Sequence, residues 1–96
     1  MERKPIEQRN IVREPFDIEL AKKITSNEVH GKIVTRDGRN VRILCFDRNS
    51  INCIVVLIDN KKWEMIESYT SDGALYDLGL ESPLDLFIER SINCQF

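Results

Sequence analysis

The chain has 96 residues, of which 42% are hydrophobic and 31% charged, with a net charge of −2 at neutral pH. This length predicts one small domain with a single modest core. The longest apolar run, Cys53 to Ile58, is far shorter than the roughly 20 residues that a membrane-spanning helix needs, so we expect no contact with a membrane. The N-terminal sequence MERKPIEQRN lacks the apolar core of a signal peptide, which predicts a cytoplasmic protein.

Residues 1–14 mix charged residues with few apolar ones, which predicts a flexible N-terminal arm. An alternative stays open, because Ile11 and Val12 have the character of a strand that pairs with a sheet edge or contacts a second subunit. Residues 15–96 are then expected to form a single small β-rich domain.

A short helix is predicted directly after this arm. Phe16, Leu20 and Ile24 recur every four residues and therefore line one side of a helix. Asp17 is a suitable N-cap, so we expect the helix to run from Ile18 to Ile24.

The sequence GKIVTRDGRNVRILCFD, residues 31–47, predicts a tight β-hairpin. Asp37 and Gly38 suit a two-residue loop, because both central residues of a type I′ turn have positive φ. With that loop, Val34 would face Val41. Both faces of the hairpin would then be partly apolar, so we expect the hairpin to be wrapped into a small barrel or covered on its second side by a helix.

Further short apolar or alternating runs, separated by turns, predict four more strands. They are residues 51–58, 63–70, 74–78 and 84–89. Together with the hairpin, these runs predict a mainly β (α+β) fold, a small antiparallel barrel or roll of about six short strands with one short N-terminal helix.

The chain has three cysteines. A turn centred on Asn49 would place Cys45 opposite Cys53 in neighbouring strands. Since cytoplasmic redox conditions disfavour disulfides, we expect these two cysteines to be buried, reduced neighbours.

The succession FDIELAK, VTRDGRNVRILCFD, IVVLID, YTSDGALYD and SPLDLFI extends from Phe16 to Ile88. This pattern resembles a group of small uncharacterised proteins of gut Bacteroidales, their phages and mobile elements. A looser similarity, in the short helix that enters a strand ending in basic residues, is to phage proteins that sequester nucleotide-type immune signals such as those of Thoeris defence, although this chain lacks their Arg-Lys-Gly-Trp type run. The resemblance implies a sequestering module and brings no catalytic residues with it.

Motifs for catalysis and for metal or cofactor binding are missing from the sequence. His30 is the single histidine, and no two cysteines have the close spacing of a zinc knuckle. No nucleophile elbow, phosphate-binding glycine loop or HExxH run occurs. We therefore expect no enzyme activity, no cofactor and no metal site.

Charge is divided unevenly along the chain. Residues 1–48 contain 11 basic and 8 acidic residues, a balance of +3, whereas residues 49–96 contain 3 basic and 8 acidic ones, a balance of −5. One explanation is a basic surface that binds an anion. The alternative is that the arginines pair with the acidic half, either across the fold or across a homo-oligomer.

The candidate ligand site lies on the predicted hairpin. In the predicted register Arg42 and Phe46 share one strand face, and Arg36 and Arg39 lie at the turn. Guanidinium groups beside an aromatic ring suit a phosphate or a nucleotide. These four residues are therefore the predicted ligand-binding residues.

The preferred interpretation is a non-enzymatic binding or sequestering module, whose ligand is a small anionic molecule or a protein partner. The first alternative is a nucleic-acid-binding accessory protein that uses the basic hairpin, which the acidic net charge makes less favourable. The second alternative is a structural subunit of a homo-oligomer, assembled through edge strands.

Overall fold

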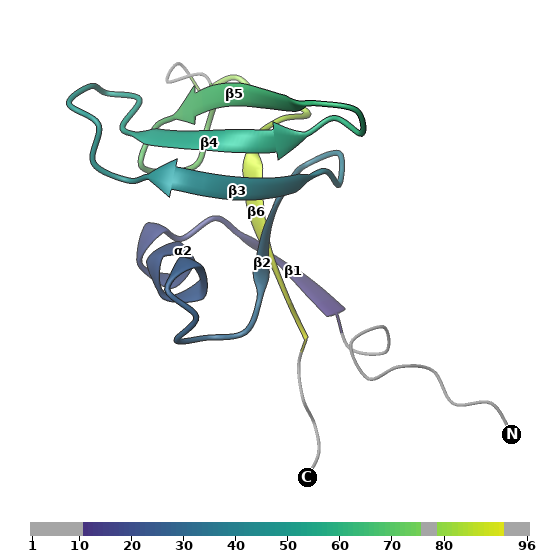
Figure 1. Cartoon of the computed structure of the whole chain (residues 1–96). Helices are drawn as coiled ribbons and strands as arrows, with labels where there is room; N and C mark the ends of the chain where they lie inside the picture. The colour runs from purple at the N-terminus through teal and green to yellow at the C-terminus, as the bar shows by residue number, and fades with distance from the viewer. Residues whose placement is uncertain (1–10, 76–78, 92–96) are drawn as a thin grey trace, which may run out of the picture.

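The computed structural model describes residues 11–75 and 79–91. This part of the chain is mostly strand with a single short helix, so the predicted fold class is confirmed (Figure 1). In chain order, its elements are β1 (Ile11–Pro15), α2 (Ile18–Thr25), β2 (Lys32–Thr35), β3 (Asn40–Cys45), β4 (Ile54–Asp59), β5 (Glu64–Tyr69) and β6 (Leu86–Ser91).

The six strands form one antiparallel sheet in the order β1-β6-β2-β3-β4-β5. The sheet is open, with β1 and β5 at its two edges, so the predicted roll is confirmed and the predicted barrel is wrong. Only two opposed residue pairs join β2 to β3, and in Figure 1 β2 and β6 cross the direction of β3, β4 and β5. A sharp bend at this junction, rather than closure, lets the sheet enclose a core.

The helix α2 begins and ends close to the predicted positions. The carboxylate of Asp17 accepts hydrogen bonds from the backbone amides of Glu19 and Leu20, at 2.9 and 3.3 Å, so it is the N-cap. The helix buries Ala21 and Ile24 against the sheet. Helical periodicity and a capping residue were therefore sufficient to locate this element.

Thr35 and Arg39 are the last hydrogen-bonded pair between β2 and β3, and the loop that they close contains three residues, so the predicted two-residue loop is wrong. The amide of Gly38 donates to the carbonyl of Thr35, and the amide of Thr35 donates to the carbonyl of Arg39, both at 2.9 Å. Gly38 has a φ of 92°, whereas Asp37 is not at positive φ. This is a type I turn followed by a left-handed residue, the usual geometry of three-residue hairpin loops.

The extra loop residue shifts the pairing of β2 with β3 by one position. Ile33 faces Val41, while Val34 faces Asn40. Because neighbouring residues in a strand point to opposite faces, Val34 and Val41 lie on opposite sides of the sheet. The predicted Val34–Val41 pair is therefore wrong.

A β-bulge at Leu44 changes the faces a second time. Ile43 faces Val56, but Cys45 faces Val55, so Leu44 has no direct partner in β4. Val56 is fully buried in the core, and Val55 points the other way. Residues beyond the bulge are therefore on the face opposite to the one that simple alternation predicts.

This bulge separates two residues that were expected on one face. Phe46 packs against the core, whereas Arg42 lies on the exposed side of the sheet. Cys45 and Cys53 are free thiols, as predicted, but they are half-buried rather than buried. They do not face each other, because Cys45 faces Val55. The third cysteine, Cys94, lies outside the described residues.

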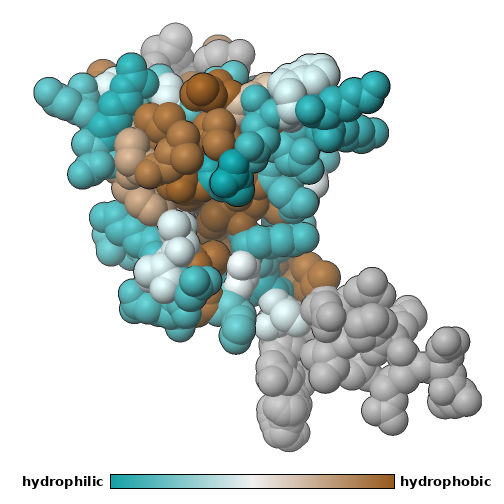
Figure 2. Space-filling model, in the orientation of Figure 1, coloured by the Kyte–Doolittle hydropathy of each residue, from teal (hydrophilic) through white to brown (hydrophobic). Residues whose placement is uncertain are grey.

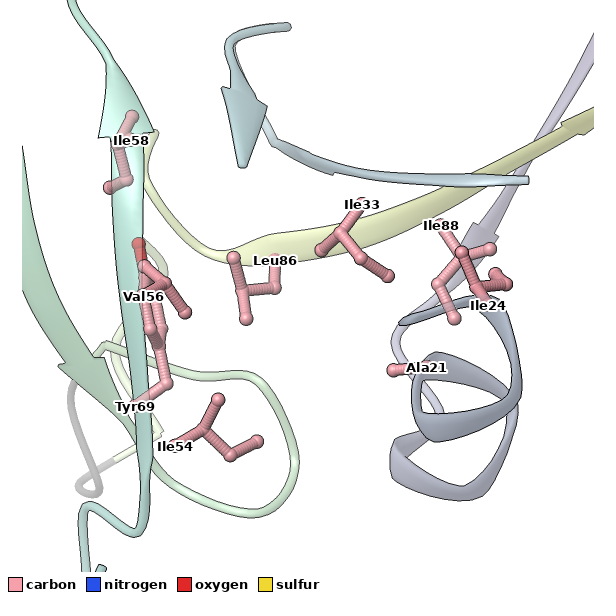
Figure 3. Packing of buried hydrophobic residues seen from close by; sticks show 9 residues of the cluster. All are labelled: Ala21, Ile24, Ile33, Ile54, Val56, Ile58, Tyr69, Leu86 and Ile88. Carbon is pink, nitrogen blue, oxygen red and sulfur yellow. The ribbon is translucent and has the colours of Figure 1, made fainter. Parts of the chain in front are cut away.

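The core lies in the concave side of the bent sheet (Figure 3). Buried side chains of β4 and β5 point toward those of β2, β6 and α2, which all lie on the same side of the two strands. The residues are Ala21, Ile24, Ile33, Ile54, Val56, Ile58, Tyr69, Leu86 and Ile88.

Two segments of the chain have a structure that differs from the predicted one. Residues 11–15 form β1, which pairs with β6, so this end of the predicted arm adds a strand to the sheet. In the predicted strand 74–78, Ala74 and Leu75 are not in a strand, and residues 76–78 lie outside the described residues. The sheet therefore contains β1 in place of one predicted strand.

The segment between β5 and β6 is held by two side chains. The hydroxyl of the buried Tyr69 donates to the carbonyl of Leu84 at 2.6 Å. The carboxylate of Asp85 accepts hydrogen bonds from the backbone amides of Leu75 and Ser82, each at 2.9 Å.

Within the described residues, no helix has both the length and the apolar character needed to cross a membrane.

Candidate functional site

Arg42 lies on the outer side of β3 and pairs with a carboxylate two strands away. Its guanidinium donates to both carboxylate oxygens of Glu64 on β5, at 2.7 and 2.8 Å. These hydrogen bonds lower the pKa of Glu64 and raise that of Arg42. One of the predicted phosphate contacts is therefore occupied by a carboxylate of the same chain.

Arg36 lies at the hairpin loop and turns toward β6. Its guanidinium is 3.3 Å from the carboxylate of Asp85, donates to the carbonyl of Ser82 at 3.1 Å, and lies 4.8 Å from the centre of the Phe87 ring. Arg13 lies 5.8 Å from the same ring. An arginine does stack on an aromatic ring here, but the ring is Phe87 rather than Phe46.

Arg39 and Phe46 lie in different surroundings. The guanidinium of Arg39 is 3.3 Å from the carboxylate of Asp37 and donates to the side-chain oxygen of Asn60 at 3.1 Å. The ring of Phe46 lies 5.9 Å from the ammonium group of Lys22 and packs against the core.

The four predicted ligand-binding residues therefore do not form one cluster. Arg42 lies on the side of β3 that points away from the core, whereas Phe46, directly after β3, packs against the core. Arg36 and Arg39 turn to different partners. Each arginine has a carboxylate partner, and two of these carboxylates belong to the acidic half of the chain. These contacts agree with the alternative explanation for the uneven charge, in which the arginines pair with carboxylates across the fold. Binding of an anion stays a prediction.

The hollow beside Arg36 does not have the chemistry of an anion site. It has a volume of about 440 Å³, and the described residues that line it are one arginine, two acidic residues and two residues without charge. They are Arg36, Asp37, Glu81, Ser82 and Pro83. An anion entering this hollow would meet more negative than positive charge.

A second hollow, of about 510 Å³, lies at the other end of the β1-β6-β2 half of the sheet. It contains the single histidine, His30, together with Lys32, Glu89 and Arg90. Lys32 lies 4.0 Å from the carboxylate of Glu89, and Arg90 is paired with Glu14 at 2.7 Å. Across the described ranges, no three histidine, cysteine or acidic side chains gather in the way a metal ion requires.

The most distinctive surface is the side of β3, β4 and β5 that points away from the core, which we call the outer face. Along β4, alternate residues are buried in the core, and the residues between them point to the outer face. Figure 2 shows apolar side chains gathered over these three strands. They are Leu44, Cys45, Val55, Leu57 and Ile66.

Two of these residues are large and mostly exposed. Leu44 is 54% exposed and Ile66 is 69% exposed, and Val55 and Leu57 lie between them with partial exposure. The sequence contained a signal for this surface, because residues 54–58 are apolar at every position. We expected a helix or barrel closure to cover this second side, but α2 packs on the core side. That expectation is wrong, and the outer face is the part of the surface that sequence reasoning missed.

Comparisons with known proteins give no further guide. No family model, no curated protein and no solved structure matches the chain. The resemblance to small proteins of gut Bacteroidales, their phages and mobile elements therefore stays a prediction.

Proposed function

We propose that the protein is a non-enzymatic binding module whose partner is another protein, and that it binds this partner through the outer face of β3, β4 and β5. The observation that carries the proposal is the continuous exposure of apolar side chains from Leu44 to Ile66 on that face. Small soluble domains rarely leave a contiguous apolar surface uncovered, and such surfaces usually contact a partner.

The free energy gained by covering exposed apolar side chains supports binding at the outer face. Covering an exposed Leu or Ile side chain contributes about 1.5 to 3 kcal/mol. Leu44 and Ile66 are more than half exposed, and the partly exposed Val55 and Leu57 connect them. A protein partner that covers these residues gains more than one that contacts the arginines, because the arginines already have carboxylate partners.

The same ion pairs weigh against a small anion or a nucleic acid. A phosphate at Arg42 would first have to displace Glu64, which accepts two hydrogen bonds from the guanidinium. The acidic net charge adds repulsion. A cytoplasmic module of phage or mobile-element type is compatible with a protein partner, and free thiols at Cys45 and Cys53 fit that compartment.

The proposal is tested by capture from an extract of the cells that express the gene. Ile66→Ser should prevent retention of a protein that the wild type retains. Ile51→Ser is the matched control, because Ile51 is 72% exposed but lies in the loop between β3 and β4. A partner lost with Ile66→Ser and kept with Ile51→Ser supports the proposal. Equal capture of the protein by the wild type, Ile66→Ser and Ile51→Ser contradicts the proposal. So does a captured protein that is lost only when Arg36 is replaced, in the variant Arg36→Ala.

A further inference from the structure

The free edge of β5 presents a regular row of backbone groups. In the β4–β5 hairpin, the amide of Asn60 donates to the carbonyl of Trp63 at 2.9 Å, which makes these residues a hydrogen-bonded pair. Hydrogen-bonded and non-hydrogen-bonded pairs alternate along an antiparallel ladder. The amides and carbonyls of Glu64, Ile66 and Ser68 therefore point away from β4, toward the edge.

These edge groups are available for pairing with another strand. The register of β5 with β4 runs from Glu64 to Tyr69 without a bulge. Among the described residues, no strand pairs with the far side of β5, and no loop backbone bonds to the edge groups of Glu64, Ile66 or Ser68. Within the part of the chain that the structure describes, the edge of β5 is therefore six residues long, free of bulges and unpaired.

The two edges of the sheet differ in how they are protected. The edge strand β1 carries Arg13, Glu14 and Pro15, and charged residues and proline are the usual means of blocking an edge. Strand β5 contains no proline. It carries two charged residues, Glu64 and Glu67, but Arg42 binds Glu64, and the central residue, Ile66, is apolar and 69% exposed. The less protected edge therefore borders the outer face.

We propose that the free edge of β5 pairs with the same edge of a second copy of this chain, in antiparallel register centred on Ile66. This inference rests on the proposed function, because it names a partner that covers the Ile66 end of the outer face. A two-fold axis perpendicular to the sheet would place Ile66 opposite its own copy and Glu64 opposite Ser68. Each of these pairs exchanges backbone hydrogen bonds, because all three residues point theirs to the edge.

Charge and side-chain type select this register over its neighbours. Centred on Ile66, the register places Met65 opposite Glu67, and no two acidic residues face each other. Centred on Glu67, it would place two carboxylates directly opposite one another, which is destabilising. Centred on Met65, it would bury Glu64 against Ile66 and remove the carboxylate from its bonds with Arg42.

Pairing at this edge also joins the two outer faces. The axis keeps the outer face of each copy on the same side of the joined sheet, because directly opposed residues of an antiparallel pair share a face. Ile66 of one copy then contacts Ile66 of the other, and the Leu57 side chains lie one strand further out on each side. The dimer would thus cover the most exposed apolar residue of the sheet.

The experiment is charge complementation at Ile66, followed by native mass spectrometry with one variant labelled with nitrogen-15. The wild type should show a concentration-dependent dimer. Ile66→Lys and Ile66→Glu should each be monomeric at concentrations where the wild type is dimeric, since each places like charges opposite one another. Mixing the two variants should restore a dimer that contains one copy of each. Ile51→Lys should dimerise like the wild type, because Ile51 lies away from β5.

A second measurement uses the wild type only and does not depend on how the variants fold. The amides of Ile66 and Ser68 should exchange with solvent at least about tenfold more slowly at a concentration that gives dimer than at one that gives monomer. A wild type that stays monomeric up to its solubility limit, a dimeric Ile66→Lys variant, or a mixture that stays monomeric would each overturn the inference. If a heterologous protein is still captured in an Ile66-dependent manner, the proposed function survives and only the identity of the partner is wrong.

Discussion

Arg42 on β3 and Glu64 on β5 join two strands that are not neighbours, through two hydrogen bonds of 2.7 and 2.8 Å that pass over β4. Both side chains lie on the outer face, and Leu57 of β4 lies between their strands. Arg42 comes from the basic half of the chain and Glu64 from the acidic half. The uneven charge distribution therefore finds part of its explanation within one molecule.

This pair should respond to salt as an exposed ion pair does. A double-mutant cycle with Arg42→Gln and Glu64→Gln measures the coupling free energy between the two side chains. This coupling free energy should be small, and it should decrease further when the salt concentration rises from about 50 mM to about 500 mM. The pKa of Glu64, followed by NMR, should rise toward its ordinary value in Arg42→Gln, because the hydrogen bonds from Arg42 lower it. An unchanged pKa would show that the pair does not form in solution.

Asp85 should make stability depend on pH in the acidic range. Burial opposes ionisation of Asp85, but the amides of Leu75 and Ser82 and the guanidinium of Arg36 outweigh it, so the pKa of Asp85 lies below its ordinary value. Because the pKa of Asp85 is lower in the folded protein than in the unfolded chain, its ionised carboxylate adds to the free energy of unfolding. This contribution is fully present above the unfolded-state pKa of about 4, and it is lost as the pH falls through the folded-state pKa.

The variant Asp85→Asn should therefore lose about 2 kcal/mol of unfolding free energy at pH 7. The difference from the wild type should narrow as the pH falls below about 4, because the wild-type carboxylate then becomes protonated. Urea unfolding at pH 7, 5 and 3 measures this. Glu81→Gln, a change at an exposed carboxylate nearby, is the control and should have little effect at any of these pH values. A difference in unfolding free energy between the wild type and Asp85→Asn that stays constant or widens in acid would contradict the prediction.

Gly73 and Gly38 both have positive φ, 79° and 92°, but only Gly73 is crowded. A Cβ atom at Gly73 would lie 2.6 Å from Cγ of Phe16, whereas nothing lies within 4 Å of one at Gly38. Gly38→Ala should cost only the backbone strain, about 1 to 2 kcal/mol. Gly73→Ala should cost about 2 kcal/mol more, because Phe16 has to move. Thermal or urea unfolding of the two variants gives the comparison, and equal losses would refute the packing of Phe16 on this turn.

Local signals in the sequence were reliable where one interaction decides the structure. Asp17 and the four-residue spacing of Phe16, Leu20 and Ile24 are enough to start and orient α2. The continuous apolar run of residues 54–58 likewise predicted a strand, β4, but it did not show which side of that strand faces the core. These features depend on hydrogen bonds and periodicities within a few residues of each other.

Features that depend on longer-range contacts were not predictable in this way. Asp37-Gly38 is compatible with both a two-residue and a three-residue loop, and the difference of one residue reverses every face of the hairpin. The bulge at Leu44 has no local signature, yet it moves Phe46 away from Arg42. The acidic partners of Arg36 and Arg42, which are Asp85 and Glu64, come from segments far away in sequence, so the candidate site could not be assembled from the hairpin alone.

The central claim is that the outer face contacts a protein, and hydroxyl-radical footprinting tests it most directly. The protein is labelled once at high dilution in pure buffer and once in an extract of the cells that express the gene. Leu44 and Ile66 should lose at least about half of their labelling in the extract, while the loop residue Ile51 keeps its labelling. Protection confined to the hairpin around Arg36 and Arg39, with Leu44 and Ile66 labelled equally in both conditions, would contradict the account.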